Sequence, residues 1–180
     1  MKIVKKILIV IGIIIAIPLI AALFLKKEYA VERSITIQKS KIEVFDYVKL
    51  LKNQDNYSKW QKMDPNMRKT YKGTDGTVGF VSAWESLSKE VGKGEQEIIA
   101  IVEGERIDYK LHFIEPFESE EKAYMITEQV AEKETLVKWG FKGKMKYPMN
   151  LMLLFMDLEK MIGSDFDEGL RSLKNILEVK

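Results

Sequence analysis

The chain has 180 residues, of which 46% are apolar and 31% charged, and this suits one globular domain. The apolar share argues against intrinsic disorder, and the charged share argues against a polytopic membrane protein. With no cysteine and only one histidine, His112, the chain excludes disulfide scaffolds, thiol nucleophiles, iron–sulfur clusters and multi-histidine metal sites. Five lysines and no acid lie in residues 1–27, which leaves 24 basic against 27 acidic side chains in the remainder. A slightly acidic body has no electrostatic footprint for nucleic acid.

An uninterrupted apolar run extends from Ile7 to Leu25. As a helix it would be roughly 28 Å long at ~1.5 Å per residue, close to the ~30 Å hydrocarbon core of a bilayer. A secretory signal peptide is the alternative, but its apolar region usually has only about 7–15 residues, and no clean cleavage site follows this run. We therefore expect residues 1–27 to be an uncleaved, single-pass transmembrane anchor with basic flanks.

Lysines lie on both sides of the apolar run, so the positive-inside rule does not decide its orientation. Three of them, Lys2, Lys5 and Lys6, precede the run, which is the usual start of an anchor whose N-terminus is cytoplasmic. We therefore expect a membrane protein whose body lies outside the cytoplasm.

Behind the anchor, the pattern predicts a strand followed by two helices. Residues 29–38 alternate between apolar and polar positions, the period of a strand. Ser40 with Glu43 three residues later forms a capping box, which predicts that a helix begins there. A second short helix is expected over residues 54–62, because Pro65 soon stops it.

The middle of the chain predicts an antiparallel meander of five strands separated by turn residues. These runs span residues 78–87, 95–102, 106–113, 124–131 and 136–147. In the third run, Ile107 and Tyr109 share one face while Asp108 and His112 share the other, so one face is buried and the other wet. On that wet face, His112 is expected to be a solvated surface residue and not a general base. The acidic segment 118–122 is expected to be a solvated turn.

From about residue 150 to residue 178 the apolar period returns to 3.6, which predicts one long amphipathic helix. Its stripe comprises Leu151, Leu154, Phe155, Leu158, Ile162, Phe166, Leu170, Leu173 and Leu177. Gly163 and Gly169 lie inside this helix at a cost of about 1 kcal/mol each, which indicates close packing or a bend. We expect an α+β domain over residues 29–180, with a curved antiparallel sheet wrapped around the C-terminal helix.

Several motifs follow one another in order along residues 29–178. They are Val31-Glu32-Arg33-Ser34-Ile35-Thr36-Ile37, Trp60, Gly76-Thr77-Val78-Gly79, Gly92-Lys93-Gly94-Glu95, Val137-Lys138-Trp139-Gly140-Phe141 and the ending from Gly163 to Lys174. Together they resemble the START-like helix-grip superfamily, also labelled SRPBCC or polyketide cyclase/dehydrase, in a membrane-anchored bacterial form.

The resemblance implies a cavity between the concave face of the sheet and the C-terminal helix, of the kind that holds sterols, lipids or polyketides in relatives. The candidate ligand-binding residues that would line it are Phe80, Trp84, Tyr109, Phe113, Trp139, Phe141, Met145, Leu154, Phe155 and Leu158. The alternative for each of them is plain core packing. No catalytic residue, metal ligand or cofactor is expected, because the acidic side chains of the strands have no obvious partner.

The leading hypothesis is a membrane-anchored domain that binds or transports a hydrophobic small molecule or lipid at the membrane surface, with no nucleic-acid partner. A cyclase/aromatase-type enzyme using the same cavity is the first alternative. A regulatory or protein-interaction module with a filled core is the second. The sparse acid–base inventory favours binding over catalysis.

Overall fold

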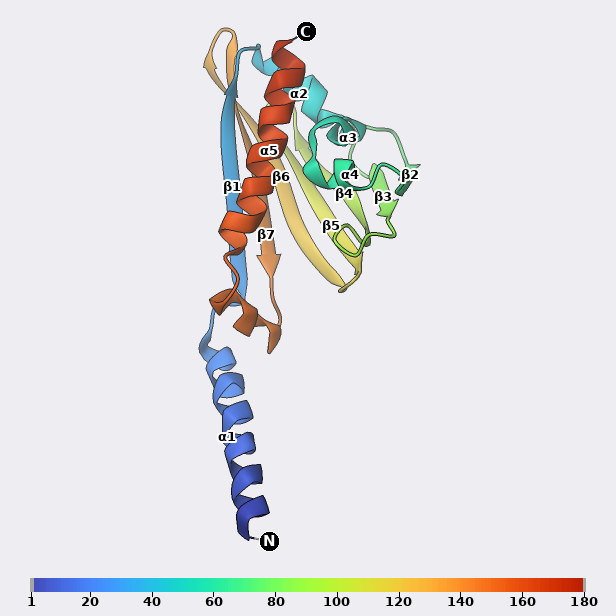
Figure 1. The fold of residues 1–180 in the computed structure, drawn as a ribbon. Helices are drawn as coiled ribbons and strands as arrows, with labels where there is room; N and C mark the ends of the chain where they lie inside the picture. Colours follow the sequence, from blue (N-terminus) through green and yellow to red (C-terminus); the bar gives the residue numbers. More distant parts are fainter. Residues whose placement is uncertain (1, 180) are drawn as a thin grey trace. The chain divides into compact units, whose positions relative to one another are not determined.

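The computed structural model describes residues 2–179 and divides the chain into two compact units (Figure 1). The first unit contains residues 1–29 and 144–158, and the second contains residues 30–143 and 159–180. Residues 1 and 180, which belong to the expected segments 1–27 and 29–180, lie outside the described residues.

The first unit is built on helix α1 (Lys2–Phe24), which by length and composition could cross a membrane or serve as a signal sequence. Most of its described apolar side chains are exposed, whereas Leu19 is half-buried and Ala22, near the end of the helix, is fully buried. There the short 3₁₀ helix η2 (Met149–Leu154) packs against it. The Asn150 Nδ2 atom donates to the carbonyl oxygens of Ala22, at 2.7 Å, and Leu25, at 3.4 Å. The last carbonyl groups of a helix lack partners within it, so Asn150 satisfies groups that would otherwise be orphaned.

The second unit contains a seven-stranded sheet in the order β1-β7-β6-β5-β4-β3-β2, with antiparallel pairing from β2 to β7. The strands are β1 (Glu28–Ile37), β2 (Arg68–Lys72), β3 (Val81–Glu85), β4 (Lys93–Val102), β5 (Arg106–Glu115), β6 (Ser119–Ala131) and β7 (Glu134–Lys144). The predicted strands are confirmed, with their ends shifted by a few residues. Strand β2 was not predicted, because its five residues are mostly exposed and show no apolar alternation.

Short helices lead from β1 to β2: α2 (Lys41–Lys49), the 3₁₀ turn η1 (Leu51–Asn53), α3 (Gln54–Tyr57) and α4 (Lys59–Met63). The predicted capping box is confirmed, with the Glu43 amide donating to the Ser40 hydroxyl and the Ser40 amide donating to the Glu43 carboxylate. The single helix expected over residues 54–62 is two helices, because Ser58 adopts an extended backbone conformation.

The C-terminal helix is shorter than the sequence predicts. Helix α5 (Leu158–Glu178) begins about eight residues later than expected, because Asn150 and its neighbours instead form η2 against α1. Leu154 and Phe155 therefore do not belong to the buried stripe, and their side chains are 59% and 85% exposed. Leu151 belongs to η2 as well, and the stripe is confirmed within α5, where Phe166, Leu170, Leu173 and Leu177 are all buried.

Aromatic rings join the sheet to the helices that cover its inward face. The Trp139 ring on β7 stacks on Phe166 of α5, with ring centroids 4.6 Å apart. Tyr57 of α3 and Trp60 of α4 meet Trp139 edge-on at 5.7 and 6.2 Å. A Cβ atom on Gly169 would lie 2.7 Å from the Trp139 ring, so a glycine is needed for this close approach.

Gly163 lies nearer the start of α5. A Cβ atom there would lie 2.3 Å from the Arg33 guanidinium, which forms ion pairs with Glu159 and Asp167 on the same helix. Close packing therefore explains Gly169, whereas the atoms near Gly163 are the end of a flexible side chain that can shift.

We predict that deletion of residues 1–27 releases the protein from the membrane and leaves residues 30–143 and 159–179 folded, because their core is built from their own side chains. Membrane fractionation and the thermal melt of the fragment check this. A fragment that is unfolded or aggregated in the absence of detergent would show that the anchor is part of the folding unit.

We also predict that Trp139→Ala lowers the free energy of unfolding by about 3–5 kcal/mol, because three rings and Gly169 pack around this indole. Trp84→Ala is the matched control. Trp84 is half-buried with one edge-on ring neighbour, Phe113, and its loss is expected to cost less. Urea titration of the full chain in detergent measures both values. A loss below about 1 kcal/mol for Trp139→Ala would contradict a tightly packed aromatic cluster.

Candidate ligand-binding site

The structure places the predicted cavity-lining residues in two groups. Phe80, Tyr109, Trp139, Phe141, Trp84 and Phe113 belong to the second unit, where the first four are buried and the last two half-buried. Met145, Leu154, Phe155 and Leu158 belong to the first unit. Leu154 and Leu158 there line a pocket of about 560 Å³. A shared cavity lined by all ten residues stays a prediction.

A buried polar cluster lies in the interior of the second unit. It consists of Gln54 and Tyr57 on α3 and Tyr109 on the buried face of β5, with exposed fractions of 4%, 0% and 0%. The Gln54 Nε2 atom and the two hydroxyl oxygens have no hydrogen-bond partner among the described residues. An unsatisfied buried polar group costs about 1–3 kcal/mol, and such groups are rare in folded proteins. Three of them in one cluster therefore require an explanation.

The electrostatics of the cluster make it a set of hydrogen-bond donors at neutral pH. Burial raises the pKa of Tyr57 well above its usual value, and the neighbouring Tyr109 raises it further. Burial is also the main cause of the raised pKa of Tyr109. The Gln54 side chain acts in the opposite direction and lowers the pKa of both tyrosines, but burial outweighs it. Both phenols therefore stay protonated at neutral pH, and each of the three groups can donate a hydrogen bond to a further acceptor.

Hydrogen bonds between side chains and the backbone fix the turn before α3, the helix that carries the buried Gln54 and Tyr57. The Asp75 carboxylate accepts the amides of Leu51, at 2.8 Å, and Lys52, at 3.2 Å, at the start of η1. The Asn53 side chain donates to the Tyr47 carbonyl at 2.8 Å. These bonds anchor both sides of the turn that precedes α3. The donor cluster is therefore held in place by these bonds.

A buried carboxylate lies on the same sheet. Glu121 of β6 is 8% exposed and belongs to the alternating set of buried residues that continues with Ala123, Met125 and Thr127. The expectation of a solvated turn over residues 118–122 is therefore wrong, because β6 begins at Ser119. The excess of charge in this segment hides the alternation that would have predicted a strand.

The expectation that His112 is a solvated surface residue is met only in part, because the residue is half-buried. Its side chain is 26% exposed, and its ring nitrogens lie 3.6 Å from Glu95 and 3.4 Å from Glu118. Within residues 2–179, no group of three or more His, Asp or Glu side chains is arranged to hold a metal ion.

The donor cluster is not predicted by the sequence pattern. Gln54 and Tyr57 are three residues apart and so share one face of a helix, which was a usable signal. Whether their polar atoms find partners is decided in the folded interior, and no spacing rule predicts it.

Neither family models nor curated protein sequences match the chain. Several solved protein structures match the chain. The chain is similar to a crystal structure of Ara h 8.0201, with 14% identity, a TM-score of 0.57, and coverage of 85% of this chain and 99% of that one. A norcoclaurine synthase from Thalictrum, solved with a transition-state analogue, matches with 7% identity, a TM-score of 0.58, and coverage of 83% and 96%.

StfQ, a di-domain ARO/CYC protein of the steffimycin biosynthetic pathway, matches with 10% identity and a TM-score of 0.61. The match covers 84% of this chain and 51% of StfQ. The curved sheet, the long C-terminal helix and these three structural similarities agree, and the chain has the START-like helix-grip fold.

Proposed function

We propose that the second unit binds a largely apolar small molecule or lipid that carries an oxygen acceptor. The observation behind this proposal is the donor cluster of Gln54, Tyr57 and Tyr109, whose three buried donor groups lack partners. A carbonyl, carboxylate or hydroxyl oxygen of a ligand would accept from them and remove their desolvation cost. The aromatic and aliphatic side chains around the cluster suit an apolar ligand body.

The fold supports a small-molecule ligand. The norcoclaurine synthase structure holds a transition-state analogue on the same fold, and StfQ is an ARO/CYC protein. These are properties of those proteins, and for this chain they support the class of ligand that the donor cluster suits.

Binding is favoured over catalysis because the donor cluster contains no base. Its two phenols have raised pKa values and therefore do not accept protons near neutral pH. A cyclase-type enzyme is the second candidate function, and the buried Glu121 carboxylate on the same sheet is the observation that favours it. Catalysis would require this carboxylate to reach a proton of the ligand held by the donor cluster.

We further propose that the protein works at a membrane surface through α1 as a retained anchor. A cleaved signal peptide would leave the folded protein, whereas the end of α1 is integrated into a folded unit. Asn150 is fully buried and donates to the carbonyls of Ala22 and Leu25, and the Met145 amide donates to the Lys27 carbonyl at 2.8 Å. These bonds support retention of the helix.

We predict that Tyr57→Phe raises the free energy of unfolding of the ligand-free protein by about 1 kcal/mol or more. The substitution removes a buried hydroxyl that has no partner, and so removes its desolvation cost. Tyr124→Phe is the control, because the Tyr124 hydroxyl donates to Glu32 at 2.5 Å and its removal should cost stability. Urea titrations of full-length protein stripped of small molecules on an apolar resin provide the measurement. A destabilised Tyr57→Phe variant would mean that the hydroxyl is already satisfied.

We predict that loss of the tyrosine hydroxyl groups weakens ligand binding, although it stabilises the ligand-free protein. A photoreactive palmitic acid with a diazirine in its chain is added to the full chain in nanodiscs, and the cross-linked peptides are mapped by mass spectrometry. Wild-type protein and Tyr124→Phe are expected to be labelled in α3 and β5. The Tyr57→Phe/Tyr109→Phe double variant should be labelled about ten-fold less at these two elements, because two donors to the probe carboxylate are gone. Labelling of α1 by probe dissolved in the bilayer is the internal reference. Equal labelling of α3 and β5 in all three proteins would refute the proposed site.

A further inference from the structure

The first unit contains a pocket that the proposed function does not use. It has a volume of about 560 Å³ and lies within residues 1–29 and 144–158. Its lining is Leu25, Lys26, Glu28, Tyr29, Asn150, Leu153, Leu154, Met156, Asp157 and Leu158. One part of this lining is aliphatic, and the other part carries one cation, two carboxylates and an amide. This is the pattern of a site for an amphipathic molecule.

Asn150 gives the pocket an unsatisfied acceptor. Its side chain is fully buried, and its Nδ2 atom is directed to the carbonyl oxygens of Ala22 and Leu25. Because both of these partners are acceptors, the atom that faces them must be the amide nitrogen. The Oδ1 atom then has no donor among the described residues. A ligand in this pocket would satisfy it with an N–H or O–H group.

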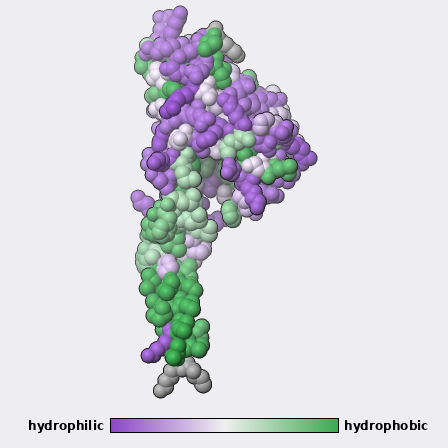
Figure 2. Space-filling model, viewed as in Figure 1, coloured by the Kyte–Doolittle hydropathy of each residue, from purple (hydrophilic) through white to green (hydrophobic). Residues whose placement is uncertain are grey.

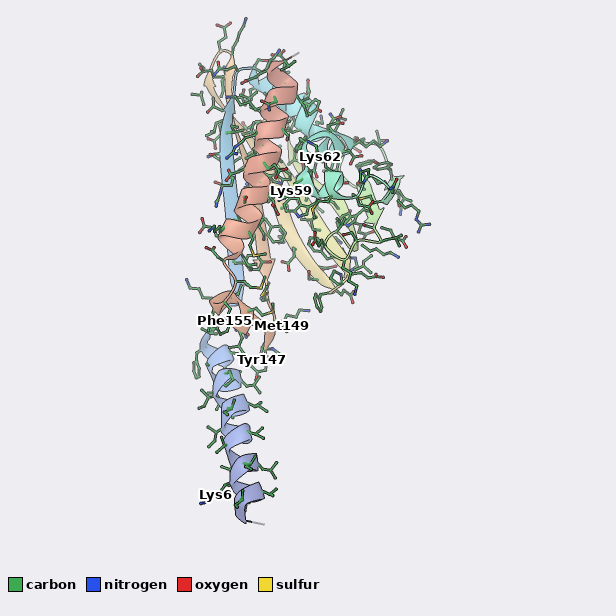
Figure 3. All side chains as sticks on the ribbon, viewed as in Figure 1. Lys6, Lys59, Lys62, Tyr147, Met149 and Phe155 are labelled. Atoms are coloured by element: carbon green, nitrogen blue, oxygen red, sulfur yellow. The ribbon has the colours of Figure 1, made fainter. Side chains whose placement is uncertain are left out.

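The source of that ligand follows from where the pocket lies in the chain. Helix α1 ends at Phe24, so a membrane-spanning α1 brings residues 25–29 to the level of the lipid headgroups. The segment that closes the pocket also exposes apolar side chains, including Tyr147, Met149 and Phe155, which are 43%, 50% and 85% exposed. Figure 3 shows these three side chains beside the end of α1, and Figure 2 shows the apolar surface of α1 continuing onto this segment. An apolar surface continuous with a membrane span is in contact with lipid.

We infer that this pocket binds one bilayer phospholipid with an ethanolamine headgroup. The ammonium group would donate to Asn150 Oδ1 and lie near the carboxylates of Glu28 and Asp157, both of which also interact within the protein, Glu28 with Lys144. The Lys26 ammonium would pair with the lipid phosphate, and the aliphatic side chains of the lining would contact the start of an acyl chain. This inference rests on the membrane part of the proposed function. It makes the first unit a binding unit for one lipid.

The test compares phosphatidylethanolamine with phosphatidylcholine, which differ only in three methyl groups that remove the N–H donors. The full chain is released from nanodiscs that contain the two lipids in equal amounts, and native mass spectrometry counts the lipids retained. We expect one retained lipid, with ethanolamine favoured over choline about five-fold, the effect of one hydrogen bond. Equal retention of the two lipids by the wild-type protein would overturn the inference.

Two variants in the same segment control for folding and for nonspecific lipid. Leu153→Trp adds bulk inside the pocket and should abolish the retained lipid, whereas Met149→Trp adds the same bulk at an exposed position outside the lining and should keep it. Retention of the lipid by Leu153→Trp would also overturn the inference. The photoreactive palmitic acid reports on the second unit in the same samples, so the two sites can fail separately. Leu153→Trp should leave labelling of α3 and β5 unchanged, and Tyr57→Phe/Tyr109→Phe should leave phospholipid retention unchanged.

Discussion

The inward face of the sheet and the apolar stripe of α5 bury each other, and the stacked rings of Trp139 and Phe166 lie where they meet. Neither surface would be stable in water alone, since each large aromatic side chain buries roughly 150–250 Å² on packing. Gly169 permits the close approach of the helix. The ion pair between Lys59 of α4 and Asp165 of α5, at 2.6 Å, joins the short helices to the same assembly. Figure 3 labels Lys59 and Lys62 of α4 beside α5.

The position of the donor cluster follows from this packing. Tyr57 meets the edge of Trp139 with its ring, so α3 is held against the sheet and its polar atoms are carried into the interior. Three unpartnered donors there lower the stability of the ligand-free protein. Proteins retain such unfavourable groups mainly where they serve a function, because a Phe at either tyrosine position would pack at lower cost. We propose that these groups are retained because they select a ligand that carries an oxygen acceptor.

Much of the fold could be predicted from the sequence because two periodicities alternate clearly along it. The period of two at Ile107 and Tyr109, and the period of 3.6 from Phe166 to Leu177, directly reflect burial against one partner. The secondary-structure prediction was wrong where a segment's conformation depends on contacts with a distant part of the chain, which its own apolar spacing does not reveal. Residues around Asn150 have helical spacing, but contacts with the end of α1 select a 3₁₀ turn instead.

The candidate site was less accessible to prediction. Tyr109 was correctly assigned to the buried face of its strand, whereas Gln54 was read only as part of a short helix. Whether a buried hydroxyl has a partner depends on side chains from several elements, and one sequence does not contain that information. Glu121 was missed for a related reason, because its charged neighbours suggested a turn.

The central claim is that the interior of the second unit holds an apolar molecule through an oxygen acceptor. A mass spectrum of the small molecules extracted from purified full-length protein tests it most directly, with Tyr57→Phe/Tyr109→Phe purified in parallel. The account predicts a species with an apolar body and an oxygen acceptor that is present in the wild-type extract and depleted in that of the variant. Identical extracts from the two proteins, with every species also present in extracts of the surrounding membrane and detergent, would contradict it.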